Sequence, residues 1–376
     1  MAWKFLQYFS DSFSAAHLVY AEGKVWAFGT TGAFKVYDYW NTTAANREYL
    51  NDMDFIASSE IDRALTVVDS GTVTGSPTIR KIVKFFDKFY ITTSTSLIVF
   101  DYHTKTVTAT KTLPGTFLAS FCIAGNKVWF IEQEPPNFAT NRRAYVNWYN
   151  IQTDTWGSAE IPVRFSSTTQ YVESGYLSNI IITSPGTDEV VEFDFNTATF
   201  VRARAYAPLV NRILTTEDGQ VYVQTNNSFL VQYNQLTDAV TGFSGTRGGN
   251  TFFIDSGTGY FWLFNGTNAF TRIKKADKTS AFTPALNQIL SPGYELNMPG
   301  GSTNYTDVVC AIATPPLTFQ EWNGTGFVDR TVKPYMFMCR SGTVYAVRLS
   351  GMVRLNSSQV RGAAMVTVGP DDFRGD

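Results

Sequence analysis

The stretch Gly219-Gln220-Val221-Tyr222-Val223-Gln224-Thr225-Asn226-Asn227-Ser228-Phe229-Leu230-Val231-Gln232-Tyr233-Asn234 decides the fold class of this chain. Apolar and polar residues alternate on both sides of the polar residues 225–227, which predicts two strands joined by a turn. The second strand ends in an aromatic residue followed by Asn, and this ending recurs along nearly the whole sequence. We call the recurring Asp or Asn positions blade anchors: Asp38, Asp101, Asn150, Asp194, Asn234, Asn265 and Asn323.

The spacing of the blade anchors predicts the architecture. They lie 63, 49, 44, 40, 31 and 58 residues apart, and strand-built repeats of roughly 40–50 residues are typical of β-propellers. We therefore predict an all-β fold, a single β-propeller over residues 1–361 with a C-terminal tail at 362–376. The seven anchors favour seven blades, with six and eight as alternatives. An open ring would leave two sheet edges unpaired, so we predict that an N-terminal strand at 3–9 pairs with C-terminal strands and closes the ring.

The uneven spacing of the anchors predicts inserted loops. The longest lie at about 44–78, 133–145 and 276–304, and Pro284 to Leu290 could form a short helix in the third. Long loops on a rigid scaffold are where binding residues usually lie. These loops are therefore the segments that we expect to contact partners.

One repeat carries a family resemblance. Tyr149-Asn150-Ile151-Gln152-Thr153-Asp154-Thr155-Trp156 resembles the kelch-repeat pattern, and residues 193–200 and 100–107 are degraded copies of it. In this pattern Asp or Asn caps a tight turn through its own backbone, and the Thr and aromatic residues pack on the next strand. The double glycine of kelch repeats is missing, so the resemblance implies a propeller and no kelch function.

The amino-acid composition argues against several classes of function. The chain has 30 basic and 32 acidic residues and a net charge of −2, so the clustered positive charge that nucleic-acid binding requires is absent. Charged residues make up only 16%, and a surface poor in charge is suited to permanent contact with neighbours. The start lacks the pattern of a secretory signal and no apolar run reaches membrane-spanning length. We expect a protein made in the cytoplasm, with three free cysteines, Cys122, Cys310 and Cys339.

No catalytic, cofactor or metal site is predicted. The chain has only two histidines, His17 and His103, which excludes a His-rich metal site. Paired carboxylates could in principle cleave a glycoside, and the candidate pairs are Asp52 with Asp54, Glu132 with Glu134, and Asp188 with Glu189. Because nothing in the sequence positions these pairs around a pocket, we expect them to be solvated.

These observations favour a non-enzymatic structural or interaction protein. Low charge, degenerate repeats and irregular insertions point most specifically to a virion component of a tailed phage, in its tail, neck or fibre. Its partners would be other virion proteins or further copies of the chain. A second hypothesis is a carbohydrate-binding adhesin that uses Trp40, Trp148, Trp156 and Trp322, because aromatic rings cover the apolar faces of sugars. A polysaccharide hydrolase or lyase is the third.

Overall fold

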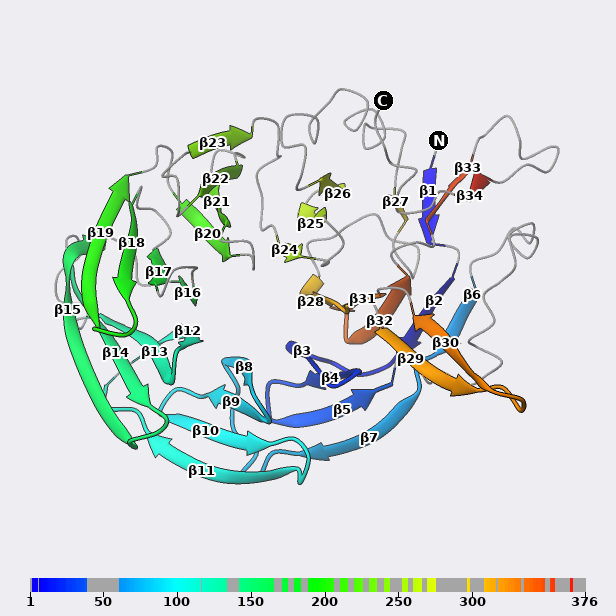
Figure 1. Cartoon of the computed structure of the whole chain (residues 1–376), viewed down its shortest axis with the longest axis horizontal. Coiled ribbons are helices and arrows are strands. Elements are labelled where there is room, and N and C mark those ends of the chain that lie inside the picture. Colours follow the sequence, from blue (N-terminus) through cyan, green and yellow to red (C-terminus); the bar gives the residue numbers. More distant parts are fainter. Residues whose placement is uncertain are drawn as a thin grey trace. The chain divides into compact units, whose positions relative to one another are not determined.

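The structure is a computed structural model of the full chain, shown in Figure 1. The residues that it describes are 2–5, 7–38, 61–115, 117–133, 142–165, 171–174, 179–183, 189–205, 210–215, 220–225, 230–234, 240–243, 252–255, 260–265, 269–274, 296–297, 308–315, 317–332, 335–348, 352–355 and 366–367.

The described residues form strands and turns only, in agreement with the predicted all-β class. No helix capable of crossing a membrane occurs in this part of the chain. The chain divides into two compact units, which are described separately: a terminal unit of Met1–Thr72 with Asn250–Asp376, and a central unit of Val73–Gly249.

The central unit consists of four-stranded antiparallel sheets in which each strand pairs with the next one along the chain. The strands of these sheets are, in order, β8 (Lys81–Phe85), β9 (Lys88–Thr92), β10 (Ser96–Asp101) and β11 (Thr106–Thr112); β12 (Phe117–Ala124), β13 (Lys127–Gln133), β14 (Arg142–Asn150) and β15 (Thr155–Phe165); β16 (Tyr171–Ser174), β17 (Asn179–Thr183), β18 (Glu189–Asp194) and β19 (Thr199–Ala205); and β20 (Val210–Thr215), β21 (Gln220–Thr225), β22 (Leu230–Asn234) and β23 (Val240–Phe243). The strands predicted around residues 225–227 are β21 and β22, which pair antiparallel.

Neighbouring sheets of the central unit pack through apolar layers. One layer joins the β8–β11 and β12–β15 sheets and contains the fully buried Leu97, Phe121 and Phe130. A second joins the β12–β15 and β16–β19 sheets and contains Trp129 and Ile180. The first strands of neighbouring sheets also lie beside one another, because β12 contacts both β8 and β16. Face-to-face packing of this kind buries both sides of the inner strands.

The terminal unit holds similar sheets with more irregular order. Their strands, in order of pairing, are β3 (His17–Ala21), β4 (Lys24–Phe28), β5 (Ala33–Tyr37) and β7 (Val67–Thr72); β24 (Phe252–Asp255), β25 (Tyr260–Asn265) and β26 (Ala269–Lys274); β28 (Val308–Ala313), β31 (Tyr335–Arg340), β32 (Thr343–Arg348), β2 (Gln7–Asp11) and β6 (Ile61–Ala64); β27 (Leu296–Asn297), β1 (Ala2–Phe5), β33 (Met352–Leu355) and β34 (Val366–Thr367); and β29 (Leu317–Trp322) with β30 (Phe327–Val332). An apolar layer containing Val25, Phe337 and Val344 joins the β3–β7 sheet to the sheet of β28 and β31.

The predicted pairing between the two chain ends is present. β2 pairs antiparallel with β32, and β1 pairs antiparallel with β33. β2 also has β6 as a parallel neighbour, so it lies inside the sheet instead of at its edge. Closure of a complete ring and the number of blades stay predictions.

The predicted loops are partly corrected. The segment 44–78 contains β6 and β7, and β7 is the fourth strand of its sheet. β7 was missed because it is exposed along nearly its whole length and lacks a buried, alternating face. Residues 142–145 belong to β14, and Val366–Thr367 of the predicted tail form β34. The rest of 133–145 beyond Gln133, most of 276–304 and the helix at 284–290 lie outside the described residues.

Candidate functional site

Asp101, Asn150 and Asp194 build the same turn in three successive sheets of the central unit. Each ends the third strand of its sheet, and its Oδ1 accepts hydrogen bonds from the backbone N–H groups two and three residues later. The donors are His103 and Thr104, Gln152 and Thr153, and Asn196 and Thr197, at 2.8–3.1 Å. These oxygens are therefore used by the local backbone.

The fifth residue of each turn has a left-handed backbone. Lys105, Asp154 and Ala198 occupy this position with φ of 58°, 54° and 56°. The next residue is Thr in all three turns, and its hydroxyl lies 2.7–2.8 Å from the hydroxyl of a Thr two residues earlier. The kelch-like pattern thus encodes a turn.

Charged side chains at these turns also join neighbouring sheets. Lys111 on β11 donates to Asp154 at 2.7 Å, and Asp154 accepts from the Tyr149 hydroxyl at 2.8 Å. The Lys111 ammonium and the Tyr149 hydroxyl lower the pKa of Asp154, whereas burial and the Asp154 hydrogen bond raise the pKa of Tyr149 to about 12. Lys127 on β13 donates to the backbone oxygens of Phe195 and Asn196 in the next sheet. These contacts have a structural role.

The other four blade anchors also lie at or just after the end of a strand, but their surroundings differ. Asp38 follows β5 and its N–H donates to Thr66 O at 3.3 Å, while Asn234 and Asn265 end β22 and β25. Asn323 differs from the prediction, because it lies at the tip of the two-stranded β29–β30 hairpin instead of inside a larger sheet. The hydrogen-bond pattern of the capping residue is the same, since Asn323 Oδ1 also accepts from the N–H groups two and three residues later, those of Thr325 and Gly326.

The candidate catalytic residues that the structure describes lie on separate elements. His103 is exposed in a turn of the central unit, and His17 is half-buried in β3 of the terminal unit. Glu132 on β13 accepts from the Asn147 amide at 3.1 Å, while Asp52, Asp54, Glu134 and Asp188 lie outside the described residues. Within the described ranges, no three His, Cys, Asp or Glu side chains lie close enough together to hold a metal ion.

Two of the tryptophans considered for sugar binding are packed inside one sheet. The Trp148 ring lies 5.2 Å from Trp129 and covers Gly157, where an added Cβ would clash with it. Trp156 lies 5.3 Å from the Tyr149 ring. Trp40 lies outside the described residues. Trp322 is different, because 58% of it is exposed.

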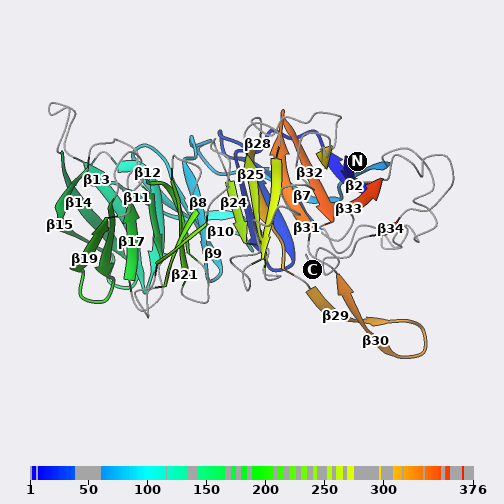
Figure 2. The same ribbon diagram turned by 90° about the horizontal axis from the view of Figure 1, so that it is seen from above.

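Trp322 lies on a hairpin that we call the aromatic arm, residues 317–332. The arm is inserted between β28 and β31, two strands that pair directly with each other. Figure 2 shows it projecting from the other sheets of its unit. Its base is fastened by Thr314, which is fully buried: its N–H donates to Tyr335 O at 2.8 Å, and its hydroxyl accepts from the Tyr335 N–H at 2.9 Å.

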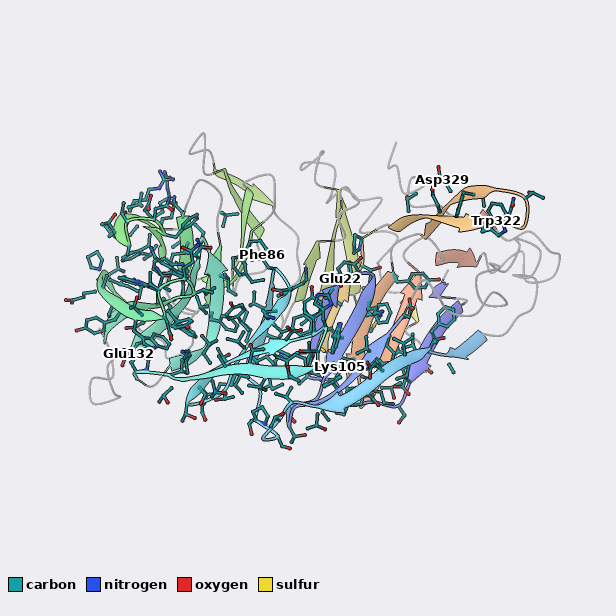
Figure 3. All side chains as sticks on the ribbon, turned by 60° about the horizontal axis from the view of Figure 1, so that its bottom comes forward. Glu22, Phe86, Lys105, Glu132, Trp322 and Asp329 are labelled. Carbon is teal, nitrogen blue, oxygen red and sulfur yellow. The ribbon has the colours of Figure 1, made fainter. Side chains whose placement is uncertain are left out.

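One face of the aromatic arm presents exposed rings and polar groups together. Trp322 and Phe327 are directly opposite residues, their rings are 5.3 Å apart in an edge-to-face arrangement, and Phe327 is 69% exposed. Behind them the Gln320 amide donates to the Asp329 carboxylate at 3.3 Å, and Thr318 is exposed further along the strand. Figure 3 labels Trp322 and Asp329 on the arm. We take this face as the candidate functional site.

The aromatic arm lacks the stabilisation by burial that the packed sheets have. A two-stranded hairpin is at best marginally stable by itself, and two large rings left in water forgo the stabilisation that burial would give. The sequence indicated Trp322 but placed it in a weak blade repeat and missed Phe327. The sequence signal that could have identified the arm is a complete strand–turn–strand unit inserted between two strands that pair with each other.

A second exposed aromatic residue lies in the central unit. Phe86 is 74% exposed in the β8–β9 turn, labelled in Figure 3, and it has a left-handed φ of 50°. Its backbone oxygen accepts from the Tyr102 hydroxyl at 3.2 Å, and its ring lies 4.4 Å from that of Phe85. These contacts hold the turn, so Phe86 by itself is a weaker candidate than the paired rings of the arm.

Comparison with known proteins supports the fold. No protein-family model and no curated protein matches the chain by sequence. The crystal structure of the computationally designed Ika8 protein is 9% identical with a TM-score of 0.54, and the match covers 92% of this chain and 99% of the designed one. The Pan2 WD40 domain of Neurospora crassa is 8% identical with a TM-score of 0.55, and the match covers 92% and 94% of the two chains. At such identities the likeness concerns the fold alone, and the chain has an all-β fold of the propeller type.

Proposed function

We propose that this chain is a non-enzymatic interaction protein in which propeller sheets form a rigid scaffold and the aromatic arm docks another protein subunit. The exposed Trp322–Phe327 pair carries the proposal. Trp is enriched among the residues that dominate protein–protein binding energy, and here it stands beside a second ring on a projecting element. The low charge of the chain adds support, because few charges need desolvating in a permanent contact.

The most specific form of the proposal is a structural component of a tailed-phage virion. In that role the chain is made in the cytoplasm and then enters a tail, neck or fibre. The partner on the arm is another virion protein or a second copy of this chain. No cofactor or catalytic residue takes part.

The first test is assembly of the purified chain, followed by light scattering and negative-stain microscopy over a concentration series. The key variant replaces both Trp322 and Phe327 by alanine. If the rings are the docking groups, assembly weakens by about 1,000-fold, because each of the two rings contributes about 2 kcal/mol or more and every 1.4 kcal/mol is about tenfold. Val201→Ala, which removes an exposed apolar side chain outside the aromatic arm, is the control and leaves assembly unchanged.

A partner other than this chain itself is tested in a separate experiment. The wild-type chain and the double alanine variant are incubated with separately purified virion proteins, and complexes are measured by sedimentation. Equal behaviour of both chains, with no self-assembly at any concentration, would refute docking through the arm.

A carbohydrate ligand is the second candidate, favoured by the polar groups behind the rings. Gln320 and Asp329 place an amide and a carboxylate beside Trp322, a combination that suits sugar hydroxyls and apolar sugar faces. Glycan-array binding that is lost in both Asp329→Ala and Trp322→Ala would favour this function. Protein docking instead depends on the rings and tolerates Asp329→Ala.

A further inference from the structure

Cys310 and Cys339 face each other across two paired strands. They are direct register partners in the antiparallel pair of β28 and β31. Facing residues in such a pair have Cα atoms about 4.5–5.5 Å apart, which lies within the range of about 4.4–6.8 Å that a disulfide needs. Both cysteines are free in this structure.

The two thiols also point to the same neighbouring segment. The Cys310 Sγ lies 3.7 Å from Ala15 O, and the Cys339 Sγ lies 3.8 Å from Phe13 O. The two side chains are therefore on one face of the sheet, against residues 13–15. Cys310 is half-buried, whereas Cys339 is only 1% exposed.

From this geometry we propose that Cys310 and Cys339 are a redox modification site that closes to an intramolecular cross-strand disulfide on reaction with a small disulfide such as oxidised glutathione. Cys310, the more accessible thiol, exchanges first: its sulfur bonds to one glutathione sulfur, and the other glutathione leaves and takes the Cys310 proton. The Cys339 sulfur then attacks the Cys310 sulfur, expels the second glutathione and transfers its proton to it. The two protein thiols lose two electrons and two protons in total, and glutathione disulfide gains them to give two glutathione thiols.

The local chemistry fits this order of steps. Hydrogen bonding between the two sulfur groups lowers the pKa of Cys339 and raises that of Cys310. The raised pKa of Cys310 makes the initial exchange the slow, pH-accelerated step, whereas the closing step is favoured by the position of Cys339 directly opposite Cys310.

The position of the pair gives the modification a structural consequence. The chain between Cys310 and Cys339 contains the whole aromatic arm, because β29 and β30 lie between β28 and β31. A disulfide would join the two strands from which the arm emerges. The inference stands whatever the arm binds, and its test needs no ligand.

The test is oxidation of the folded, fully reduced chain with glutathione disulfide, followed by denaturation, maleimide labelling and mass measurement. We expect the number of free thiols to fall from three to one, leaving Cys122, which is buried in the other unit. Non-reducing peptide mapping should show a Cys310–Cys339 link that dithiothreitol removes. Cys122→Ser should go from two free thiols to none and give the same link.

Three results would overturn the proposal. These are three free thiols after an exposure that oxidises a reference dithiol, links that involve Cys122 or join two chains, and a Cys310–Cys339 link that forms only in denaturant. Cys310→Ser and Cys339→Ser check the order of steps, because Cys339→Ser should stop at a mixed disulfide on Cys310. If either variant fails to fold, the wild-type peptide map still decides.

Discussion

Replacing Glu192 by alanine should destabilise the central unit more than any surface substitution. Glu192 on β18 is 1% exposed, and its carboxylate accepts from Asn179 Nδ2 at 2.9 Å and from Arg202 Nε at 3.0 Å. The substitution removes these two hydrogen bonds to a charged group, each worth about 1.5–3 kcal/mol, so we expect a loss of about 3 kcal/mol or more. Most of it comes from the buried Asn179 amide, which loses this acceptor, because the Arg202 side chain is 32% exposed and its charge stays partly hydrated. The expected loss is a large fraction of the roughly 5–15 kcal/mol by which domains are stable. Glu192→Gln keeps the shape and one acceptor oxygen, so we expect it to cost about 2 kcal/mol less.

The assay is urea denaturation followed by tryptophan fluorescence, with the free energy of unfolding taken from midpoint and slope. Asp329→Ala is the control, because Asp329 is exposed and bonded only weakly to Gln320 in the contacts described above; we expect a change within about 0.5 kcal/mol. A loss below about 1 kcal/mol for Glu192→Ala would refute the reasoning. It would mean that water reaches the carboxylate, or that Arg202 readily takes another partner.

Four further substitutions or deletions test the turns, the titrating groups and the chain ends. Lys105→Gly should raise the free energy of unfolding by about 0.5 kcal/mol in urea denaturation, since Lys105 has a left-handed φ of 58° that glycine adopts without strain; a decrease would show that its side chain matters more. Backbone hydrogen bonds from Thr197 lower the pKa of Asp194, so its stabilisation is present above pH 4 and lost as the pH falls. Asp194→Asn should keep the turn, as Asn150 does, and reduce the loss of stability on acidification; an unchanged acid profile would contradict this. Tyr149 has a pKa raised by burial to about 12, so its stabilisation is present below pH 10 and lost as the pH rises towards 12, and Tyr149→Phe should flatten this alkaline limb in thermal scans; equal alkaline limbs would count against the assignment. Deletion of residues 1–9, which removes β1 and most of β2, should lower the melting temperature by at least about 6 °C because β2 lies inside a sheet; an unchanged value would disprove the role of this pairing.

The inner strands of the sheets were predictable because both of their faces are buried. In β10, residues Leu97 to Phe100 are buried without interruption, and this appears in the sequence as an apolar run ending in Asp101. The outer strands gave a weaker signal. β11 alternates between exposed and half-buried residues, and β7 is exposed almost throughout. Exposed edge strands are under no requirement to be apolar, so sequence periodicity cannot find them reliably.

The candidate site was only partly predictable. The sequence indicated Trp322 as a ring that could bind, and it predicted a strand that ends at Asn323, which is β29. It assigned this strand to a blade and did not predict the separate β29–β30 hairpin. It could not show that β29 and β30 pair only with each other among the described strands. That depends on β28 pairing with β31 across the insertion, a contact between residues far apart in the chain.

Residue types and local periodicity were enough to establish the all-β class and the recurring Asp/Asn turn. The pairing of the two chain ends was predicted from a different argument, because an open ring would leave two sheet edges unpaired. Only the tertiary packing separates buried rings from exposed ones: Trp148 and Trp322 both lie just before a blade anchor and each has one aromatic ring within about 5 Å, but only Trp148 also packs against a neighbouring sheet. It also decided that Cys310 and Cys339 are partners, because strand register is set by long-range pairing and cannot be read from residues separated by an inserted hairpin.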